Sequence, residues 1–518
     1  MAVRNVFTGR QMRQHALPDA AEAGFCLKFS PSASHPDKRG SRYAALTAAA
    51  AAAWLSLYPW AEAQADDAPS YTEIDQYHGE FSTKDGGTFS YLPDAGKFEG
   101  PGDKPVTPTG TDAPHNYLIE LNGTHLTATG TDSSGLNPSE LRILNSDEGT
   151  VSTNKLTYYT GSSAYASAGA AGGGSITFVR SRLGADNNIF DFTGTELSAS
   201  GSAQSVPDGH EPIFSSLTFT DSLQGASNSN TVTMNNGSTQ NSSVTLTGGA
   251  SAVFVSGAAG AASNTITLNG TTLSAEGVSE DGNVYGGISL VSSADGSVSG
   301  STLEINTATL QVTDGASVHF INGANGVEKY TIGLDGADIS AAGAQAGGSV
   351  YGDITLVESS HGIVSGSGSK LTLSRDGSGN RTSLAATDGA SVYFVNGAEG
   401  AEGNTIELNG ADISAKGVQA DGRVYGGAIT LIGSSDGTVS GSTVNLHSDG
   451  SGAGTTLSAT DGASIHLVSG AKGAEGNAIE INGAAITADG DQADGVTYGS
   501  SSLIESLSGT ATANKDYL

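Results

Sequence analysis

The chain has 518 residues, of which 74 are Gly and only 6% are aromatic. This composition excludes an ordinary globular core of large side chains, while Val, Ile and Leu at alternate positions of repeated segments argue against disorder. The formal net charge of −31 and the pI of about 4.4 exclude binding to nucleic acid through its phosphates.

Residues 1–65 have the pattern of a targeting segment. Basic residues within Lys38–Arg42 precede an Ala-rich apolar run, which ends shortly before Ala63-Gln64-Ala65. A positive n-region, an apolar h-region and an A-x-A site in this order predict a signal peptide. We expect cleavage after Ala65, with Ala63 as the alternative.

Two features of this leader leave alternatives open. A transmembrane anchor competes with the signal peptide, although the apolar run is short and Pro59 interrupts it. Residues 1–37 are long for a leader, so the true start codon and the role of this stretch stay undetermined. Cys26 is the one cysteine of the chain, which excludes disulfides as a source of stability.

Residues 66–115 are polar and rich in Pro. A stack of repeats needs an atypical terminal unit that covers its exposed end. We therefore expect this stretch to be an N-terminal cap or polar lead-in, followed by a repeat region at 116–505 and a polar tail at 506–518.

One segment, Asn404-Thr-Ile-Glu-Leu-Asn-Gly-Ala-Asp-Ile-Ser-Ala415, occurs six times in the chain, with variations. Successive copies lie 66 to 76 residues apart, from the numbers of the glycine that they share. Repeats of this length indicate a layered structural unit. The shared glycines, which we expect at repeat corners, are Gly123, Gly194, Gly270, Gly336, Gly410 and Gly483.

Other motifs recur in phase with this segment. A Val-Tyr-Gly motif follows each of the last four copies, loosely in the last one, and Val-Ser-Gly-Ser and Thr-Asp-Gly-Ala-Ser motifs follow in turn. In a stack of repeats, the tyrosines would lie in line as an aromatic ladder, either internal or facing a ligand; the internal ladder is the simpler prediction. They are Tyr285, Tyr351, Tyr425 and Tyr498.

The alternation of Ile406, Leu408 and Ile413 with polar residues predicts half-buried strands on both sides of Asn409-Gly410. Asn-Gly favours either a hairpin, which would give tandem β-sandwich modules, or the tight corner of a parallel β-helix. The long period and the poverty in aromatics favour an all-β, right-handed parallel β-helix of six divergent repeats. We expect three turns of about 24 residues per repeat and a rod about 80 Å long.

Several residues that could act in catalysis or metal binding have simpler structural interpretations. The recurring Asp314, Asp388 and Asp461 could form a row of metal ligands, but Asp before Gly is ordinary turn chemistry. The stretch Asp376–Asn380 resembles the opening of a calcium loop, yet Arg381 occupies the position of its glycine.

The histidines do not indicate a catalytic or metal site either. His319 and His466 share a repeat position with Tyr393, which favours a packing or surface role, and Glu358 and His361 have no repeated partner. No nucleophile elbow, P-loop or zinc spacing occurs. The sequence thus predicts no catalytic residue, metal ligand or cofactor.

The A-x-A leader, the Gly/Ser/Thr/Asn/Asp repeats with Leu-Asn-Gly and Val-Ser-Gly-Ser corners, and the acidity together resemble the passenger region of bacterial autotransporters and β-helical adhesins. The resemblance extends over residues 40–505. It implies a right-handed β-helix, exported by a Gram-negative bacterium through the periplasm and displayed on or released from the cell. The family ends in a membrane β-barrel translocator, and no such pattern follows Ser506.

The resemblance implies adhesion, autoaggregation or biofilm formation through a repetitive face. Its partners would be a host or bacterial surface protein, a glycan, or another copy of the chain, with no nucleic acid. The alternatives are a β-helical polysaccharide-degrading enzyme, which would need a non-repeated charged cluster on one groove, and a truncated passenger without independent function.

Overall fold

The computed structural model describes most of the chain from Thr72 onward. The described residues are 28–29, 72–74, 79–84, 88–92, 97–99, 117–120, 124–129, 139–146, 149–159, 163–167, 174–201, 214–280, 282–420, 423–493, 496–512 and 514–517. The signal-peptide cleavage residues Ala63 and Ala65, and the corner glycine Gly123, lie outside them.

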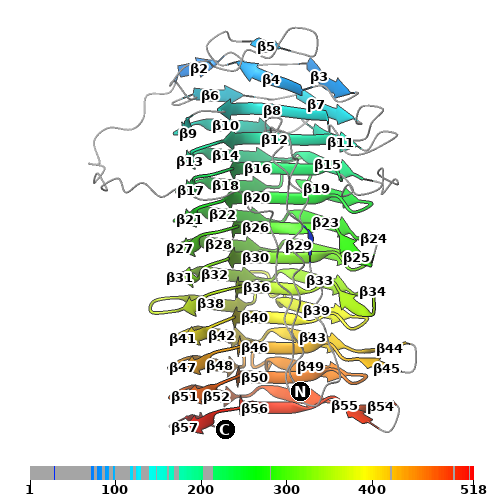
Figure 1. The fold of residues 1–518 in the computed structure, drawn as a ribbon, viewed down its shortest axis with the longest axis vertical. Coiled ribbons are helices and arrows are strands. Elements are labelled where there is room, and N and C mark those ends of the chain that lie inside the picture. Colours follow the sequence, from blue (N-terminus) through cyan, green and yellow to red (C-terminus); the bar gives the residue numbers. More distant parts are fainter. Residues whose placement is uncertain are drawn as a thin grey trace, which may run out of the picture.

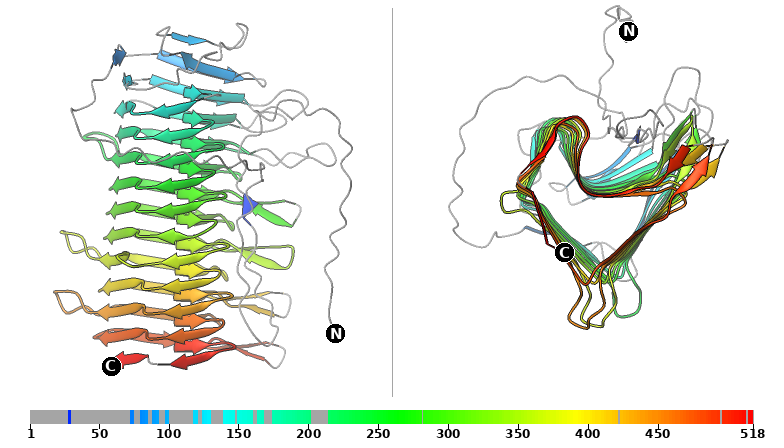
Figure 2. Two further views of the ribbon diagram at one scale, coloured as in Figure 1. Left: turned by 60° about the vertical axis from the view of Figure 1, so that its left-hand side comes forward. Right: turned by 90° about the horizontal axis from the view of Figure 1, so that it is seen from below.

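The described residues form a right-handed parallel β-helix, as the repeats predict (Figures 1 and 2). Each complete coil contributes one strand to each of four sheets, in the order I, II, III and IV along the chain. Among the described residues these sheets have 13, 12, 13 and 11 strands. Because each strand pairs with its equivalents in the coils above and below, every coil extends the same stack.

Sheet I is the first sheet of each coil, and its five-residue strands alternate buried and less buried side chains. Its strands are β2 (Thr72–Ile74), β6 (Tyr117–Glu120), β10 (Lys155–Tyr159), β14 (Ile189–Thr193), β18 (Thr231–Asn235), β22 (Thr265–Asn269), β28 (Thr302–Asn306), β32 (Thr331–Asp335), β38 (Lys370–Ser374), β42 (Thr405–Asn409), β48 (Thr443–His447), β52 (Ala478–Asn482) and β58 (Lys515–Tyr517).

Sheet II follows after a short corner and has the same alternation. Its strands are β3 (Gly79–Lys84), β7 (Thr124–Thr129), β11 (Ser163–Ser167), β15 (Glu196–Ser200), β19 (Ser243–Thr247), β23 (Thr272–Glu276), β29 (Thr309–Thr313), β33 (Asp338–Ala342), β39 (Ser383–Thr387), β43 (Asp412–Lys416), β49 (Thr456–Thr460) and β53 (Ala485–Ala488).

Sheet III contains the longest strands. β5 (Lys97–Glu99) ends it as an antiparallel edge on β4 (Thr88–Leu92). The parallel strands that follow are β8 (Ser139–Ser146), β12 (Gly174–Ser181), β16 (Ser216–Ser222), β20 (Ser251–Gly257), β26 (Gly287–Ser293), β30 (Ser317–Gly323), β36 (Ile354–Ser359), β40 (Val392–Gly397), β46 (Ala428–Ser434), β50 (Ser464–Gly470) and β56 (Ser501–Ser506).

Sheet IV is narrow and leads back to sheet I. Its strands are β9 (Thr150–Ser152), β13 (Gly184–Asp186), β17 (Ala226–Asn228), β21 (Gly260–Ala262), β27 (Ser297–Ser299), β31 (Val327–Glu328), β37 (Ile363–Ser365), β41 (Gly400–Glu402), β47 (Thr438–Ser440), β51 (Gly473–Glu475) and β57 (Thr510–Thr512). With β2 to β5 and β57 to β58, the sheets extend on both sides of the predicted repeat region 116–505.

Each sequence repeat contains two coils, so the expected division into three turns is wrong. Thr265, Thr302 and Thr331 occupy one register position in three successive coils, 37 and 29 residues apart. Together these steps span the 66 residues between Gly270 and Gly336. The coils are longer than 24 residues because each one includes four strands.

Two coils of a repeat differ at the corner between sheets II and III. One coil turns tightly through the Thr-Asp-Gly motif, where the aspartates and the glycines after them have positive φ, as at Asp314 (54°) and Gly315 (79°). The other coil inserts an antiparallel hairpin. The hairpins pair β24 (Val278–Glu280) with β25 (Asn283–Tyr285), β34 (Ala344–Ala346) with β35 (Ser349–Tyr351), β44 (Val418–Ala420) with β45 (Arg423–Tyr425), and β54 (Asp491–Ala493) with β55 (Val496–Tyr498).

The hairpins project from one edge of the stack, at the right of Figure 1. β1 (Lys28–Phe29) pairs antiparallel with β25 and gives the first hairpin a third strand. Within the described residues, equivalent hairpins recur every two coils because the insertion belongs to one coil of each of the last four repeats.

The core is a continuous apolar column inside the four sheets. Its aromatic part includes Phe178, Phe219 and Phe254, which occupy one register position in three successive coils of sheet III. The ring centroids of Phe219 and Phe254 are 4.4 Å apart with nearly parallel planes. Such stacking adds to the apolar burial that stabilises each coil.

The corner from sheet IV to sheet I is fixed by a ladder of buried asparagines. The side-chain Oδ1 of Asn264 accepts hydrogen bonds from the backbone N–H (2.9 Å) and the Nδ2 (3.2 Å) of Asn230 in the preceding coil. Its Nδ2 donates to the backbone oxygen of Ser227, at 2.9 Å. Asn230 bonds to Asn188, and Asn188 to Asn154, in the same way. Each rung therefore sets the register of one coil on the next.

Removing one rung should destabilise the helix. The Asn264→Ala variant leaves the N–H of Asn230 and the carbonyl of Ser227 buried without these partners, which costs about 1–3 kcal/mol. Urea unfolding followed by circular dichroism measures the loss, and hydrogen exchange reports faster opening at the Asn230 amide. The control Gln311→Ala changes an exposed side chain on β29. Equal stability of the two variants would contradict a structural role for the ladder.

Candidate functional site

The strands of sheet III bend in the middle. Phe254 and the next residue, Val255, both belong to the core, although neighbouring residues of a flat strand point to opposite faces. In the pairing of β20 with β16, Val253 and Val255 have Cα partners, whereas Phe254 between them has none. Seen from below, the bend curves this sheet inward between the hairpins and sheet IV (Figure 2).

This bend brings two rows of outward side chains toward each other. The positions of Val253 and Ser256 lie on either side of it and recur in each coil of the sheet. The first row continues through Ser289, His319, Thr355, Tyr393, Thr430, His466 and Ser502, and the second through Ser292, Asn322, Glu358, Asn396, Gly433, Ser469 and Glu505. We call them the first row and the second row.

A histidine of the first row approaches a glutamate of the second row in the next coil. The Nδ1 of His319 on β30 lies 3.8 Å from Oε2 of Glu358 on β36. The Nδ1 of His466 on β50 lies 3.0 Å from Oε2 of Glu505 on β56. In both pairs the Glu follows the His by 39 residues (358 − 319 and 505 − 466). The sheet therefore repeats one diagonal contact.

Burial keeps the first of these pairs uncharged near neutral pH. It raises the pKa of Glu358 to about 8, with a further contribution from the nearby Asp353 carboxylate. It also lowers the pKa of His319 to about 4. Both groups are therefore neutral at pH 7, so their 3.8 Å approach is no ion pair there.

Asp353 immediately precedes β36 and has no carboxylate equivalent in the neighbouring coils. The equivalent positions are Ser317 in the preceding coil and Ser391 in the following coil. They precede Val318 and Val392, the residues that pair with Ile354. Burial raises the pKa of Asp353 to about 6, opposed by the hydrogen bond from the backbone N–H of Ser391 at 2.9 Å. At pH 7 the site therefore holds an ionised Asp353 beside a protonated Glu358.

The second pair differs in its surroundings. His466 and Glu505 are partly exposed, and Ser502 Oγ lies 2.9 Å from the same Nδ1 of His466. The hydrogen bond from His466 is the main cause that lowers the pKa of Glu505. The same diagonal geometry thus produces a neutral buried pair in one coil and a polar surface pair near the C-terminal end.

One buried polar atom near His319 has unmet hydrogen-bonding capacity within the described residues. The Oδ1 of Asn396, which is 5% exposed, lacks a hydrogen-bond partner. Asn396 is next to Glu358 in the second row, and the carboxyl of Glu358, 7% exposed, lies 3.8 Å from His319. An unpartnered polar atom is costly to bury unless something bonds to it.

The corner glycines predicted from the sequence lie at the turns from sheet I to sheet II. Their φ angles of 62° to 75° belong to the left-handed region, which glycine adopts without strain. The other coil of a repeat has a different corner, such as Thr307, with φ 52°. The described corner glycines are Gly194, Gly270, Gly336, Gly410 and Gly483.

The four repeated tyrosines end the second strands of the hairpins. Tyr285 is buried and its ring stacks on Phe214, with centroids 4.7 Å apart. The hydroxyl of Tyr351 donates to the backbone oxygen of Gly282 in the preceding hairpin, at 2.7 Å. Tyr425 is buried in the next hairpin, and Tyr498 is half-buried in the last one. The tyrosines thus belong to the hairpins and recur two coils apart.

Asp376 is engaged by its own loop. Its Oδ1 accepts hydrogen bonds from the backbone N–H groups of Ser378 (2.9 Å) and Asn380 (2.8 Å). Asp449, two coils later, makes the same contacts with Ser451 and Ala453. The hydroxyl of Ser451 is the main cause that lowers the pKa of Asp449, and hydrogen bonds from Asn380 and its neighbours lower that of Asp376. The arrangement is a turn stabilised by its own side chain.

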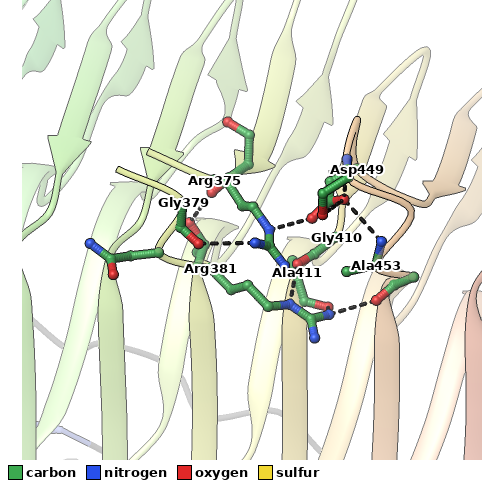
Figure 3. Close-up of polar contacts among 12 residues, drawn as sticks. Arg375, Gly379, Arg381, Gly410, Ala411, Asp449 and Ala453 are labelled. Atoms are coloured by element: carbon green, nitrogen blue, oxygen red, sulfur yellow. Dashed lines mark hydrogen bonds and ion pairs between the residues drawn. The ribbon is translucent and has the colours of Figure 1, made fainter. Parts of the chain in front are cut away.

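Two arginines join these loops across the coils (Figure 3). Arg375 forms an ion pair with Asp449. Arg381 donates from Nε to the backbone oxygen of Gly410, at 2.7 Å, and contacts the carboxylate of Asp412, at 2.8 Å. Arg375 also donates to the backbone oxygen of Gly379 in its own loop, at 3.0 Å. Because Asp449, Gly410 and Asp412 belong to later coils, these arginines act as structural staples.

No group of three or more His, Cys, Asp or Glu side chains within the described residues could hold a metal ion. The same part of the chain has no helix with the length and apolar content that crossing a membrane requires. Comparison of this chain with protein-family models, with curated proteins and with solved structures finds no match.

The pairing of His319 with Glu358 was not predicted from the sequence. Aligned repeats compare each His with the residue two coils away, whereas the contact joins adjacent coils. A signal does exist: Glu358 and Glu505 each follow the tyrosine of a Val-Tyr-Gly type motif by seven residues (358 − 351 and 505 − 498).

The raised pKa of Glu358 predicts a pH-dependent stability. The folded protein holds this proton more tightly than the unfolded chain, where the pKa is 4.5. Its stabilising contribution is therefore complete below the unfolded pKa and is lost as the pH rises through about 8. The Glu358→Gln variant should lose less free energy of unfolding than the wild type between about pH 5 and about pH 9.

Urea unfolding across this pH range measures the difference. The control Glu304→Gln alters an exposed carboxylate on β28 and should follow the wild type. Parallel pH profiles for the wild type and Glu358→Gln would contradict the burial of a protonated Glu358.

Proposed function

We propose that this chain is an exported surface or secreted protein, resembling autotransporter passengers, that acts in adhesion, autoaggregation or biofilm formation. A Gram-negative bacterium would send it through the periplasm to the cell surface or the medium. The observation that supports this proposal is the exact coil-to-coil register, which arranges equivalent outward groups in straight rows along the β-helix.

The repeated hairpins add a second periodic feature. They project from the same edge every two coils, and neighbouring hairpins contact each other, as β25 contacts β34 and β45 contacts β54. A stiff rod with equivalent groups at fixed spacing can engage several copies of a ligand at once. Each further contact then forms at a high effective concentration, so weak single contacts add up to firm attachment.

A second candidate function is the cleavage of a polysaccharide, favoured by two nearby carboxyls, Asp353 just before β36 and Glu358 on it, that differ in protonation at pH 7. In this reaction Glu358 passes its proton to the leaving glycosidic oxygen, while Asp353 takes a proton from the attacking water. The carbon–oxygen bond breaks as the water oxygen bonds to the sugar carbon. Release of reducing ends from polysaccharides, lost in Glu358→Gln, would support this function, and no release would exclude it.

Excision of one repeat tests the proposed adhesion. Gly410 and Gly483 occupy the same corner two coils apart, so deletion of residues 411–483 joins equivalent positions and removes one hairpin. The shortened protein should remain folded and lose about 10 Å of length. Its attachment to cells or to itself should fall more than in proportion to length, because avidity depends on the number of contacts.

Attachment and aggregation of cells that display the two proteins provide the measurement. Circular dichroism of the shortened protein, with equal display levels, is the control for folding. Unchanged attachment after the deletion, and after a second deletion of residues 271–336 between two other equivalent corners, would contradict binding by a repetitive face.

A further inference from the structure

We infer that the outward face of sheet III around His319, Glu358 and Asn396 binds a neutral, polyhydroxylated ligand, namely a glycan chain that lies along the axis of the β-helix. This inference deepens the proposed function and rests on it, because it assigns a place and a ligand class to the adhesive face. It requires no metal ion and no covalent step.

An unmet hydrogen bond in the second row is the first argument. The Oδ1 of Asn396 is more than nine-tenths buried and has no hydrogen-bond partner in the described residues. The buried carboxyl of Glu358 is adjacent to Asn396 in the ladder, and the bend of the strands brings the second row toward the first row. A ligand that bonds to Asn396 recovers the cost of its burial, and Glu358 can bond to the same ligand.

The types of group at the site define the chemistry of the ligand. A carboxylic acid, a primary amide, an imidazole and the hydroxyl of Thr355 each donate and accept hydrogen bonds at pH 7. Sugar hydroxyls have the same dual character and can bond in either direction. A ligand made of hydroxyl groups therefore matches Glu358, Asn396, His319 and Thr355 together.

The charge of the site argues against an anionic glycan as its ligand. Glu358 and His319 are neutral at pH 7, Asp353 is ionised, and the three strands β30, β36 and β40 contribute no Lys or Arg to either row. The chain as a whole has a formal charge of −31. At these three strands an anionic glycan would meet repulsion without a compensating cation, whereas a neutral one would not.

The geometry favours an elongated ligand. Tyr393, half-buried in the first row one coil after Thr355, offers an aromatic ring against which the apolar face of a sugar ring can pack. Hydroxyl side chains continue the row on both sides, at Ser289 and Thr430. Because coils follow at about 4.8 Å, successive polar groups recur on the scale of one sugar ring.

Binding of defined oligosaccharides to the whole chain tests this inference. The neutral probes are cellohexaose and mannohexaose, and hexagalacturonate is the anionic probe of equal length. The wild type should bind at least one neutral probe in calorimetric titration and should not bind hexagalacturonate. Glu358→Leu, Asn396→Leu and Tyr393→Ala should each lower the affinity about tenfold, whereas Glu358→Gln, which still donates and accepts, should retain most of it.

The second His–Glu pair supplies a matched control. Glu505→Leu removes the same type of residue from the same row in the last coil and should leave the affinity within about twofold. Melting curves verify that each variant is folded, and Tyr393→Ala alters a half-buried side chain that folding tolerates. Failure of both neutral probes to bind, preference for hexagalacturonate, or an equal loss in Glu505→Leu would overturn the inference.

Cell attachment separates this inference from the proposed function. Repeat-dependent attachment without oligosaccharide binding would overturn the glycan site alone. Oligosaccharide binding that depends on Glu358 and Asn396, without any attachment of displaying cells, would overturn the adhesive function alone.

Discussion

The register of one coil on the next is the constraint on which the rest of this structure depends. It is set where sheet IV turns into sheet I, by buried side chains such as Asn230 and Asn264 that bond to the adjacent coil. Serine takes the asparagine position in other coils, as Ser442 does for the backbone N–H of Asn404. A slip at this corner would move the strands of all four sheets, and with them the core column and the outward rows.

The bend of sheet III gives this register a candidate site, because it brings the two outward rows together. A straight strand would keep His319 and Glu358 apart on a flat face, but two successive core residues at the bend make the outward rows converge. Convergence explains why His319 and Glu358 lose water and change their proton affinities together. The His466–Glu505 pair repeats the contact, but only the earlier coil has Asp353 beside it.

Repetition in the sequence predicted the parallel β-helix, because residues such as Ile406 and Leu408 alternate and Gly410 marks a recurring corner. It did not reveal two coils per repeat, since the coils differ in length and in their corners: one turns at Asp314 and the other extends into a hairpin ending at Tyr351. The site was hidden for a related reason. Its residues come from neighbouring coils, and the bend depends on two core residues in succession, as in Leu356 and Val357.

Small-angle X-ray scattering of residues 66–518 tests the two-coil repeat and its fixed register most directly. Sheet I has 13 strands among the described residues, which at about 4.8 Å per coil gives a rod about 60 Å long. The structure predicts this length together with one constant cross-section along the particle. A length of about 80 Å, as three turns per repeat would give, or a flexible chain of separate modules would contradict it.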